Sequence, residues 1–209
     1  MERYGVPESK VTVTHLASGI DPGRAAGDGL VPARAYFLHV GARAGYKNFA
    51  GLLSAFARAG ASLAGASLCV VGPPFAPGEQ RRIAELGLAG RVEHYGQVDD
   101  NHLAKLYRCS VALVYPSLYE GFGIPPVEAM SCGTAVVAAN RSSIPEVVGD
   151  AALLFDPDSA DELTEALILL ARDPSARESL AARGRERARL FSWEDTASRT
   201  LAVYRSVAG

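Results

Sequence analysis

The 209-residue sequence contains little cysteine or lysine and no long hydrophobic run. Its three cysteines, Cys69, Cys109 and Cys132, have neither the pairing nor the spacing of a disulfide framework or a metal site. No apolar stretch approaches the roughly 18 residues of a membrane span, and the N-terminus lacks the apolar core of a signal peptide. These absences predict a cytoplasmic protein with no membrane-spanning segment. Cys69 and Cys109 lie in or beside apolar runs, which predicts buried structural thiols.

Charge of one sign is not in excess either. The net charge of −2 gives no electrostatic reason to expect nucleic acid binding. A hydrophobic content of 48% with 21% charged residues is typical of a soluble globular protein. Of the 21 basic residues only Lys10, Lys47 and Lys105 are lysines, so the compact ammonium of Lys47 stands out in a chain that otherwise uses arginine.

Patterns that bind metal are also scarce. The four histidines are scattered without ligand spacing. The D-P-D at residues 156–158 follows an apolar run and precedes a helical segment, so a turn and a helix cap explain it. The sequence therefore predicts no metal site.

Short apolar runs alternate with helical segments along most of the chain. The runs typical of buried strands are residues 36–40, 67–71, 92–95, 111–115, 135–138 and 151–155. Helical patterns occupy residues 49–59, 78–86, 103–108, 126–130, 144–148, 160–172, 174–190 and 193–207. This alternation predicts an α/β fold, a Rossmann-like parallel sheet with helices on both faces, with ligands collecting at the carboxyl ends of the strands.

The first part of the chain has a different character. Residues 11–15, V-T-V-T-H, alternate as a strand would, and a Gly turn follows them. Residues 22–32 are rich in Gly, Ala and Pro and predict a loop or linker.

The stretch E-G-F-G-I-P-P-V-E, residues 120–128, follows the predicted strand at 111–115. Gly121 and Gly123 can take backbone angles barred to other residues, so successive N–H groups can turn toward one point and an anion can approach closely. Two prolines then suit the first turn of a helix, whose N-terminal end carries a partial positive charge. This pattern predicts a cradle for phosphate or sugar.

A carboxylate stands at each end of this stretch. Glu120 and Glu128 can each accept hydrogen bonds from a vicinal diol, on either side of amides aimed at a diphosphate. That combination describes a sugar nucleotide. The alternative is that both are ordinary carboxylates at a helix start, favoured by the helix dipole.

A second candidate anion site follows the first predicted strand, in H-V-G-A-R-A-G-Y-K-N-F at residues 39–49. Gly41 gives the turn, and Arg43 and Lys47 are four residues apart in a loop entering a helix. Both cations can therefore reach one anion beside the helix N-terminus, as in a diphosphate clamp. The alternative is a pair of solvated cations on a surface loop.

The string at residues 120–128 resembles the E-x7-E signature of retaining glycosyltransferases of the GT-B fold, family-4 type, and the resemblance covers nearly the whole chain. It implies one half of a GT-B fold, the C-terminal half that binds the donor, with additional C-terminal helices. Glu120 would lie beside the donor sugar and Glu128 would bind the ribose hydroxyls. Amides at Phe122, Gly123 and Ile124 would face the sugar and phosphates.

The same resemblance assigns the loop at residues 39–49. Gly41, Arg43 and Lys47 look like the family's glycine-Arg-Lys-Asn element, with the two cations as diphosphate ligands and stabilisers of the leaving nucleotide. Residues 142–146, S-S-I-P-E, resemble the family's loop at the edge of the donor pocket, although a helix cap explains them equally well. No metal or other cofactor is required by this chemistry.

The loop G-Q-V-D-D-N-H-L at residues 96–103 contains Asp99 and Asp100, either of which is an obvious N-cap for the next helix. In enzymes it resembles, this loop borders the nucleobase. Val98 could then pack on the ring and Asp100 could accept N–H bonds from guanine. The motifs look most like those of mannosyltransferases, so GDP-mannose is the first expectation and UDP-glucose and its relatives stay open.

The resemblance also predicts how the chain is divided. Residues 1–32 would be the end of a first domain or a linker, residues 33–190 the nucleotide-sugar domain, and residues 191–209 a helix that packs toward the first domain. The acceptor sugar or glycoconjugate, and any peripheral membrane contact, would belong to that first domain. Trp193, Leu201 and Tyr204 are then expected to be partly exposed.

We therefore expect this chain to bind a sugar nucleotide without appreciable transfer by itself. The alternative is a non-catalytic nucleotide- or sugar-binding module that acts with another chain.

Overall fold

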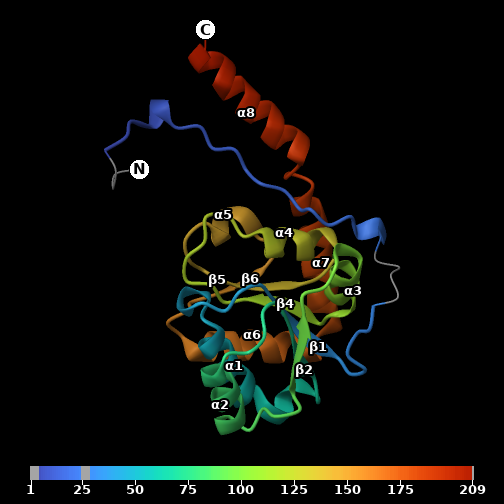
Figure 1. Ribbon diagram of the computed structural model, residues 1–209. Helices are drawn as coiled ribbons and strands as arrows, with labels where there is room; N and C mark the ends of the chain where they lie inside the picture. The colour runs from blue at the N-terminus through green and yellow to red at the C-terminus, as the bar shows by residue number, and fades with distance from the viewer. Residues whose placement is uncertain (1–4, 25–28, 209) are drawn as a thin grey trace.

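The computed structural model describes residues 5–24 and 29–208 (Figure 1). Its centre is one sheet of six parallel strands in the order β3-β2-β1-β4-β5-β6. The strands are β1 (Tyr36–Val40), β2 (Ser67–Val71), β3 (Val92–Gly96), β4 (Ala112–Tyr115), β5 (Val136–Ala139) and β6 (Leu153–Phe155). The predicted parallel sheet is confirmed, with strand bounds that differ from the prediction by two residues at most.

The strand order reverses direction between β1 and β4. From β1 the chain proceeds outward through β2 to β3, then returns to the other side of β1 for β4, β5 and β6. The two central strands pair through Phe37 with Ala112 and Leu38 with Leu113. In open parallel sheets this switch point leaves a crevice beyond the carboxyl ends of the two strands, where ligands bind.

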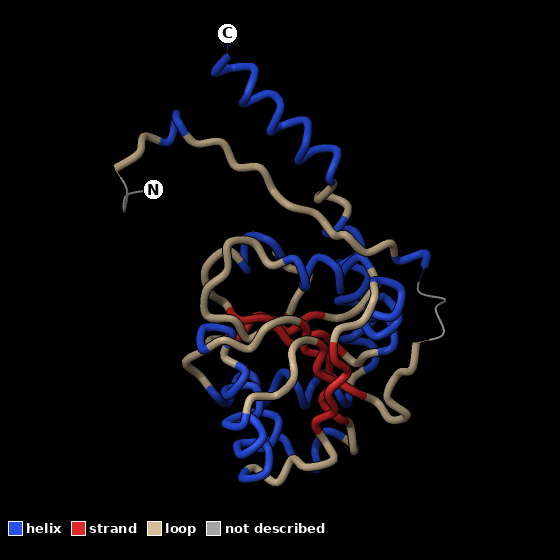
Figure 2. The backbone as a smooth tube through the Cα atoms, viewed as in Figure 1, coloured by secondary structure: helices blue, strands red, loops and turns tan. Residues whose placement is uncertain are grey.

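Helices cover both faces of the sheet, as Figures 1 and 2 show. One face is covered by α1 (Phe49–Ala59), α2 (Pro77–Glu85) and α6 (Ala160–Arg172). The other is covered by α3 (Asp100–Cys109), α4 (Ile124–Ser131) and α5 (Ile144–Val148). The last helix of this layer, α7 (Pro174–Ala188), contributes Leu180 to the first core and Ala188 to the second.

The alternation of side chains along a strand divides the core into these two layers. In β1, Phe37 packs with the α1 face, whereas Tyr36 and Leu38 pack with the α3 and α4 face. All three are fully or almost fully buried. Each large apolar side chain buried in this way stabilises the fold by about 1.5–3 kcal/mol. Strands that are buried on both faces therefore appear in the sequence as continuous apolar runs.

The final helix, α8 (Trp193–Ala208), projects away from the sheet domain, and none of its described residues is buried (Figure 1). Trp193, Leu201 and Tyr204 are 46%, 47% and 66% exposed, which confirms the expected partial exposure. Among the helices in residues 5–24 and 29–208, none combines the length and hydrophobicity of a membrane-spanning segment.

The strand predicted at residues 11–15 is wrong. This segment is extended, but within the described part of the chain it pairs with no strand. It instead runs beside the start of α8, where Thr196 Oγ1 donates a hydrogen bond to the His15 carbonyl at 2.5 Å. Val11 and Val13 are exposed, so the alternating valines do not pack against the core as the valines of a strand would.

Part of the predicted loop at residues 22–32, residues 25–28, lies outside the described residues, as do residues 1–4 of the predicted linker. Pro22–Arg24 forms a short 3₁₀ helix.

The prediction that Cys109 is buried is wrong, because it is exposed, whereas Cys69 is buried as predicted. Cys109 ends α3, and the buried positions Leu106 and Tyr107 turn other faces of that helix to the core.

Candidate functional site

The loops that follow β1 and β4 meet at the switch point of the sheet. The Leu118 amide donates to the Tyr46 carbonyl at 2.8 Å, which joins the two loops through their backbones. Close by, Lys47 Nζ donates to Glu120 Oε1 at 2.6 Å. The structure thus brings together a cation and a carboxylate that are 73 residues apart in sequence and were each predicted to belong to a site.

The Lys47–Glu120 pair is largely shielded from solvent. The two side chains are 17% and 13% exposed. The rings of Tyr46 and Tyr115 have their centroids 5.2 and 5.7 Å from Lys47 Nζ. Burial, and after it the Glu120 carboxylate, raises the pKa of Tyr115 well above its ordinary value, so its hydroxyl stays protonated. Two aromatic rings and a carboxylate hold this ammonium in place at the end of the sheet.

The turn between β4 and α4 depends on one of its two glycines. Gly123 has φ 107° and is the N-cap residue of α4, with no side-chain cap on the helix. A Cβ there would lie 2.8 Å from Ile144 Cδ1. Gly121 lacks a positive φ and has open space where its Cβ would be, so only Gly123 uses the backbone freedom that the sequence predicted for both.

Two serines brace this turn from the side of α5. Ser142 Oγ and Ser143 Oγ donate to the Glu120 carbonyl at 2.8 and 2.9 Å. Ser143 Oγ also lies 3.2 Å from the Phe122 carbonyl as a donor, and it makes no cap bond to α5. Because N–H and C=O point in opposite directions across a trans peptide, the amides of Gly121 and Gly123 face away from the serines. Residues 142–146 thus support the turn, and Ser143 does not form the side-chain helix cap that was one interpretation of them; their place at the edge of a donor pocket stays a prediction.

Glu128 lies one turn into α4 and accepts a hydrogen bond from Tyr107, a residue that no sequence motif marks. Its Oε2 accepts a hydrogen bond from the Tyr107 hydroxyl at 2.9 Å. Burial is the main cause of a raised pKa at Glu128; the Tyr107 hydrogen bond lowers it, and the charge of Asp100 raises it. The spacing of Asp100 and Tyr107, two helical turns apart, is a signal from which the second residue could have been found.

The loop after β3 approaches the same end of the sheet. Asp99 is the N-cap of α3, since its carboxylate accepts from the His102 amide at 2.8 Å. Asp100 is left in the first turn, where its charge acts on Glu128. Val98 is partly buried and packs on the core at this face. The predicted residues Val98, Asp100 and Glu128 thus lie in one neighbourhood.

Arg43 does not join the Lys47–Glu120 pair. Its Nε donates to Glu79 Oε1 at 2.8 Å, and its side chain is only 4% exposed. Gly41, with φ 118°, makes the turn after β1 as predicted, and its amide donates to the Val71 carbonyl of β2. The role of Arg43 as a diphosphate ligand stays a prediction that this geometry does not favour.

No group of three or more His, Cys, Asp or Glu that could hold a metal occurs in the part of the chain that the structure describes. The D-P-D at residues 156–158 forms a turn in which the Asp158 amide donates to Asp156 Oδ1 at 3.0 Å. Arg141 Nη2 pairs with Asp158 Oδ2 at 2.5 Å. These aspartates are therefore occupied in the way that the turn interpretation predicts.

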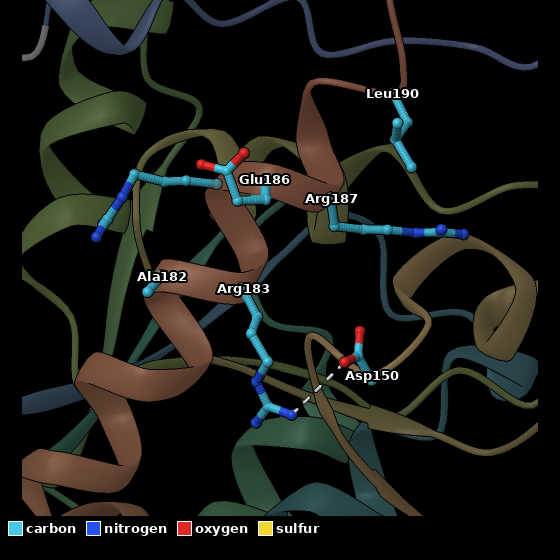
Figure 3. Close-up of a pocket in the computed structure, with 7 residues that line it drawn as sticks. Asp150, Ala182, Arg183, Glu186, Arg187 and Leu190 are labelled. Atoms are coloured by element: carbon cyan, nitrogen blue, oxygen red, sulfur yellow. Dashed lines mark ion pairs between the residues drawn. The ribbon is translucent and has the colours of Figure 1, made fainter.

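A large cavity of about 750 Å³ lies elsewhere, between the second half of α7 and the loop that carries Asp150 (Figure 3). It is lined by Asp150, Ala182, Arg183, Arg185, Glu186, Arg187 and Leu190. The ion pair between Arg183 Nη1 and Asp150 Oδ2, at 3.9 Å, crosses it. None of the predicted site residues lines it. One side of the cavity is formed by the basic run R-G-R-E-R-A-R at residues 183–189.

Comparison with known proteins identifies the family. Residues 28–187 match the family described as "Glycosyl transferases group 1", and the chain belongs to that family. It is 45% identical over 116 residues to O-antigen chain mannosyltransferase B of Escherichia coli, which covers 56% of this chain and 30% of that protein. It is 42% identical over 129 residues to an MMP alpha-(1->4)-mannosyltransferase of Mycolicibacterium hassiacum. This match covers 60% of this chain and 31% of that protein. The matched part is thus about a third of these relatives' length.

Solved structures agree on the fold. Sucrose-phosphate synthase from Thermosynechococcus elongatus superposes with a TM-score of 0.73 at 31% identity, over 85% of this chain and 46% of that chain. The C-terminal domain of a glycosyl transferase group 1 family protein from Francisella tularensis superposes with a TM-score of 0.67 at 21% identity. This match covers 85% of this chain and 95% of that chain. The chain therefore has the fold of one GT-B half, as predicted, and resembles the C-terminal half.

Proposed function

We propose that this chain is the donor-binding half of a retaining glycosyltransferase and holds a nucleoside-diphosphate sugar at the switch point of its sheet. The observation that carries the proposal is the meeting of Lys47 with Glu120 at 2.6 Å, beside the uncapped start of α4. A cation, a carboxylate and a helix N-terminus are the groups that a diphosphate and a sugar ring need side by side.

Each group has a separate task in this proposal. Lys47 and the N-terminal end of α4 stabilise the negative charge that develops on the departing diphosphate, so the reaction needs no metal from this chain. Glu120 accepts hydrogen bonds from sugar hydroxyls and orients the ring. The amides of Phe122, Gly123 and Ile124 complete the cradle. Glu120 pairs with Lys47 until the donor enters between them.

The nucleoside lies beside α3 in this arrangement. Glu128, held by the Tyr107 hydroxyl, accepts the ribose hydroxyls. Val98 packs on the base, and Asp100 accepts from its edge. An acceptor carboxylate at that position suits the N–H groups of guanine.

Mannose is the sugar that the comparisons support best, because both relatives described above are named mannosyltransferases. GDP-mannose is accordingly our first candidate for the donor. A fold neighbour from Anabaena, with a TM-score of 0.70 and 22% identity, was solved with UDP-glucose. Because identity at that level supports only the fold, UDP-linked sugars enter as the competitor to be tested.

Transfer itself needs a second half. The curated relatives are about three times as long as the segment they share with this chain, and the exposed face of α8 and the extended segment at residues 11–15 are surfaces such a half would cover. We expect this chain to bind donor and to transfer sugar only when that half is supplied, fused or in trans. Turnover by the isolated chain would contradict this division of labour.

The contribution of Lys47 can be measured with two ligands. We expect Lys47→Ala to weaken GDP binding by about tenfold to a hundredfold, as the loss of one charged hydrogen bond would, and to leave guanosine binding unchanged. Calorimetric titration of the parent chain and the variant with each ligand gives the ratio of their affinities for GDP and for guanosine. Lys10→Ala, on the exposed short helix Glu8–Lys10, is the matched control and should change neither. Equal losses for GDP and guanosine would contradict a diphosphate role.

Nucleotide binding should depend on the protonation of Glu128. Burial raises the pKa of this carboxyl, so as the pH falls it takes up a proton at a higher pH than an ordinary glutamate and loses an anionic acceptor. GDP affinity should therefore begin to fall at a higher pH than the usual glutamate range. Titrations over a pH series, with Glu128→Gln as the non-titrating control for ionisation of the ligand phosphate, measure this. Identical pH profiles for the two proteins would contradict it.

A further inference from the structure

We propose that Arg43 and Glu79 are positioning residues, which hold the loop after β1 so that Lys47 is presented to the diphosphate, and that Arg43 does not bind the ligand itself. The inference rests on the function proposed above, in which Lys47 is the cationic contact. It reassigns the second cation of the predicted clamp and gives a task to Glu79, which no motif had marked.

The guanidinium of Arg43 is already engaged by the protein. Nε and Nη2 donate to the two carboxylate oxygens of Glu79 at 2.8 and 3.2 Å. Nη2 also donates to the carbonyls of Pro73 and Pro74 at 2.7 and 2.8 Å. Such a two-pronged arginine–carboxylate pair has a fixed geometry as well as a favourable energy. Two of the three nitrogens are therefore used to join the loop after β1 to the loop after β2.

The remaining nitrogen is covered by protein. Nη1 is buried without a hydrogen-bond partner, and a Cβ on Gly72 would come within 3.5 Å of it. The rings of Phe49 and Phe75 lie 5.5 and 4.9 Å from the guanidinium carbon. Because Nη1 is buried, a phosphate oxygen cannot contact it in this arrangement. A buried donor left unpaired is unfavourable, so the other contacts of Arg43 must outweigh that cost.

Glu79 accepts hydrogen bonds both from the loop after β1 and from the start of α2. Besides Arg43, its carboxylate accepts from the Ala76 amide at 2.7 Å, at the start of α2. Its side chain is 20% exposed. Replacing the carboxylate by an amide would remove charge from the pair and change one acceptor into a donor. The position of the loop after β1 should therefore respond to a change on α2.

A short, tight turn connects Arg43 to Lys47. The 3₁₀ helix Gly45–Lys47 is closed by hydrogen bonds from the Lys47 amide to the Ala44 carbonyl at 2.7 Å and from the Asn48 amide to the Gly45 carbonyl at 3.1 Å. Asn48 then takes a left-handed conformation, φ 52°, before α1 begins. With so few torsions free between the two side chains, anchoring Arg43 also restricts where the Lys47 ammonium can lie.

A double-mutant cycle distinguishes positioning from direct binding. We expect Lys47→Ala to weaken GDP binding at least about tenfold and Glu79→Gln about threefold to tenfold, and the double variant to bind no worse than Lys47→Ala alone. Non-additivity of this kind is expected of residues that act through one another. Guanosine affinity should stay unchanged in all three, which a general loss of structure would not allow. If Arg43 were a ligand, its release by Glu79→Gln would leave GDP affinity unchanged or raise it.

The controls use the same helix and the same pair. Glu85→Gln, at an exposed position of α2 that pairs with Arg82 at 3.5 Å, should not affect GDP affinity. Arg43→Lys, which keeps the charge but cannot form the two-pronged pair, should repeat the loss and its non-additivity with Lys47→Ala, and it serves if Glu79→Gln fails to fold. Additive losses, or GDP binding unharmed by Glu79→Gln, would overturn the positioning role alone. A Lys47→Ala variant that binds GDP normally would overturn the proposed function as well.

Discussion

Replacing Gly123 by alanine is expected to remove most of the affinity for a sugar nucleotide. The residue has φ 107°, a region that L-residues rarely adopt, and the added Cβ would lie 2.8 Å from the fully buried Ile144 side chain. The strain alone costs about 1–3 kcal/mol. Relief of it would move the turn whose amides we propose to bind the sugar and phosphates, with a loss of about a hundredfold in binding if two such hydrogen bonds are misaligned.

Gly121→Ala is the matched control for this change. It lies two residues away in the same turn, without a positive φ and with nothing within 4 Å of the added Cβ. Its thermal midpoint and its affinity for GDP-mannose should stay close to those of the parent chain. Calorimetric titration and thermal unfolding of both variants make the comparison. Equal losses from the two substitutions would contradict the assignment of the turn's geometry to Gly123.

The two glutamates should separate nucleotide from sugar. Glu128→Gln is expected to weaken GDP by about 1–3 kcal/mol, because a carboxylate that accepts charged hydrogen bonds from ribose becomes a neutral amide. Glu120→Gln should leave GDP affinity nearly unchanged and reduce the extra affinity for GDP-mannose. In both variants an oxygen remains that can accept from the existing partner, Tyr107 or Lys47, so the fold should persist.

Titration of GDP and GDP-mannose against the parent chain and these two variants gives four affinity ratios. The proposed roles require the Glu128→Gln ratio to be large for both ligands and the Glu120→Gln ratio to be large only for the sugar nucleotide. Negligible effects of both substitutions, or equal effects on free nucleotide, would refute the division of tasks between the ends of the motif.

The sheet could be predicted from the sequence because of how it is buried. Strands such as β2 and β4 are covered on both faces, so their residues are continuously apolar and bounded by turn residues. The glycines that follow β1 and precede α4 marked the loops at the switch point. Lys47 and Glu120 were singled out separately, and the parallel topology is what brings their loops together.

The side-chain pairs were much harder to predict from the sequence than the strands. Nothing in the spacing of Arg43 from Lys47 indicates that Arg43 turns to Glu79 on α2, because that contact depends on how the loop after β2 packs. Tyr107 was not identified from the sequence because it has the pattern of an ordinary core residue. Its hydroxyl is important only because it donates a hydrogen bond to Glu128. The false strand at residues 11–15 shows that alternation predicts a strand only where a sheet edge is available to pair with it.

The most direct test of the central claim, that this chain alone contains a donor-nucleotide site, is calorimetric titration with GDP, UDP and ADP in metal-free buffer. We predict that one nucleotide binds without metal and that it is GDP, with GDP-mannose binding more tightly than GDP. Absence of binding by all three nucleotides, or binding that appears only when a divalent cation is added, would contradict the account.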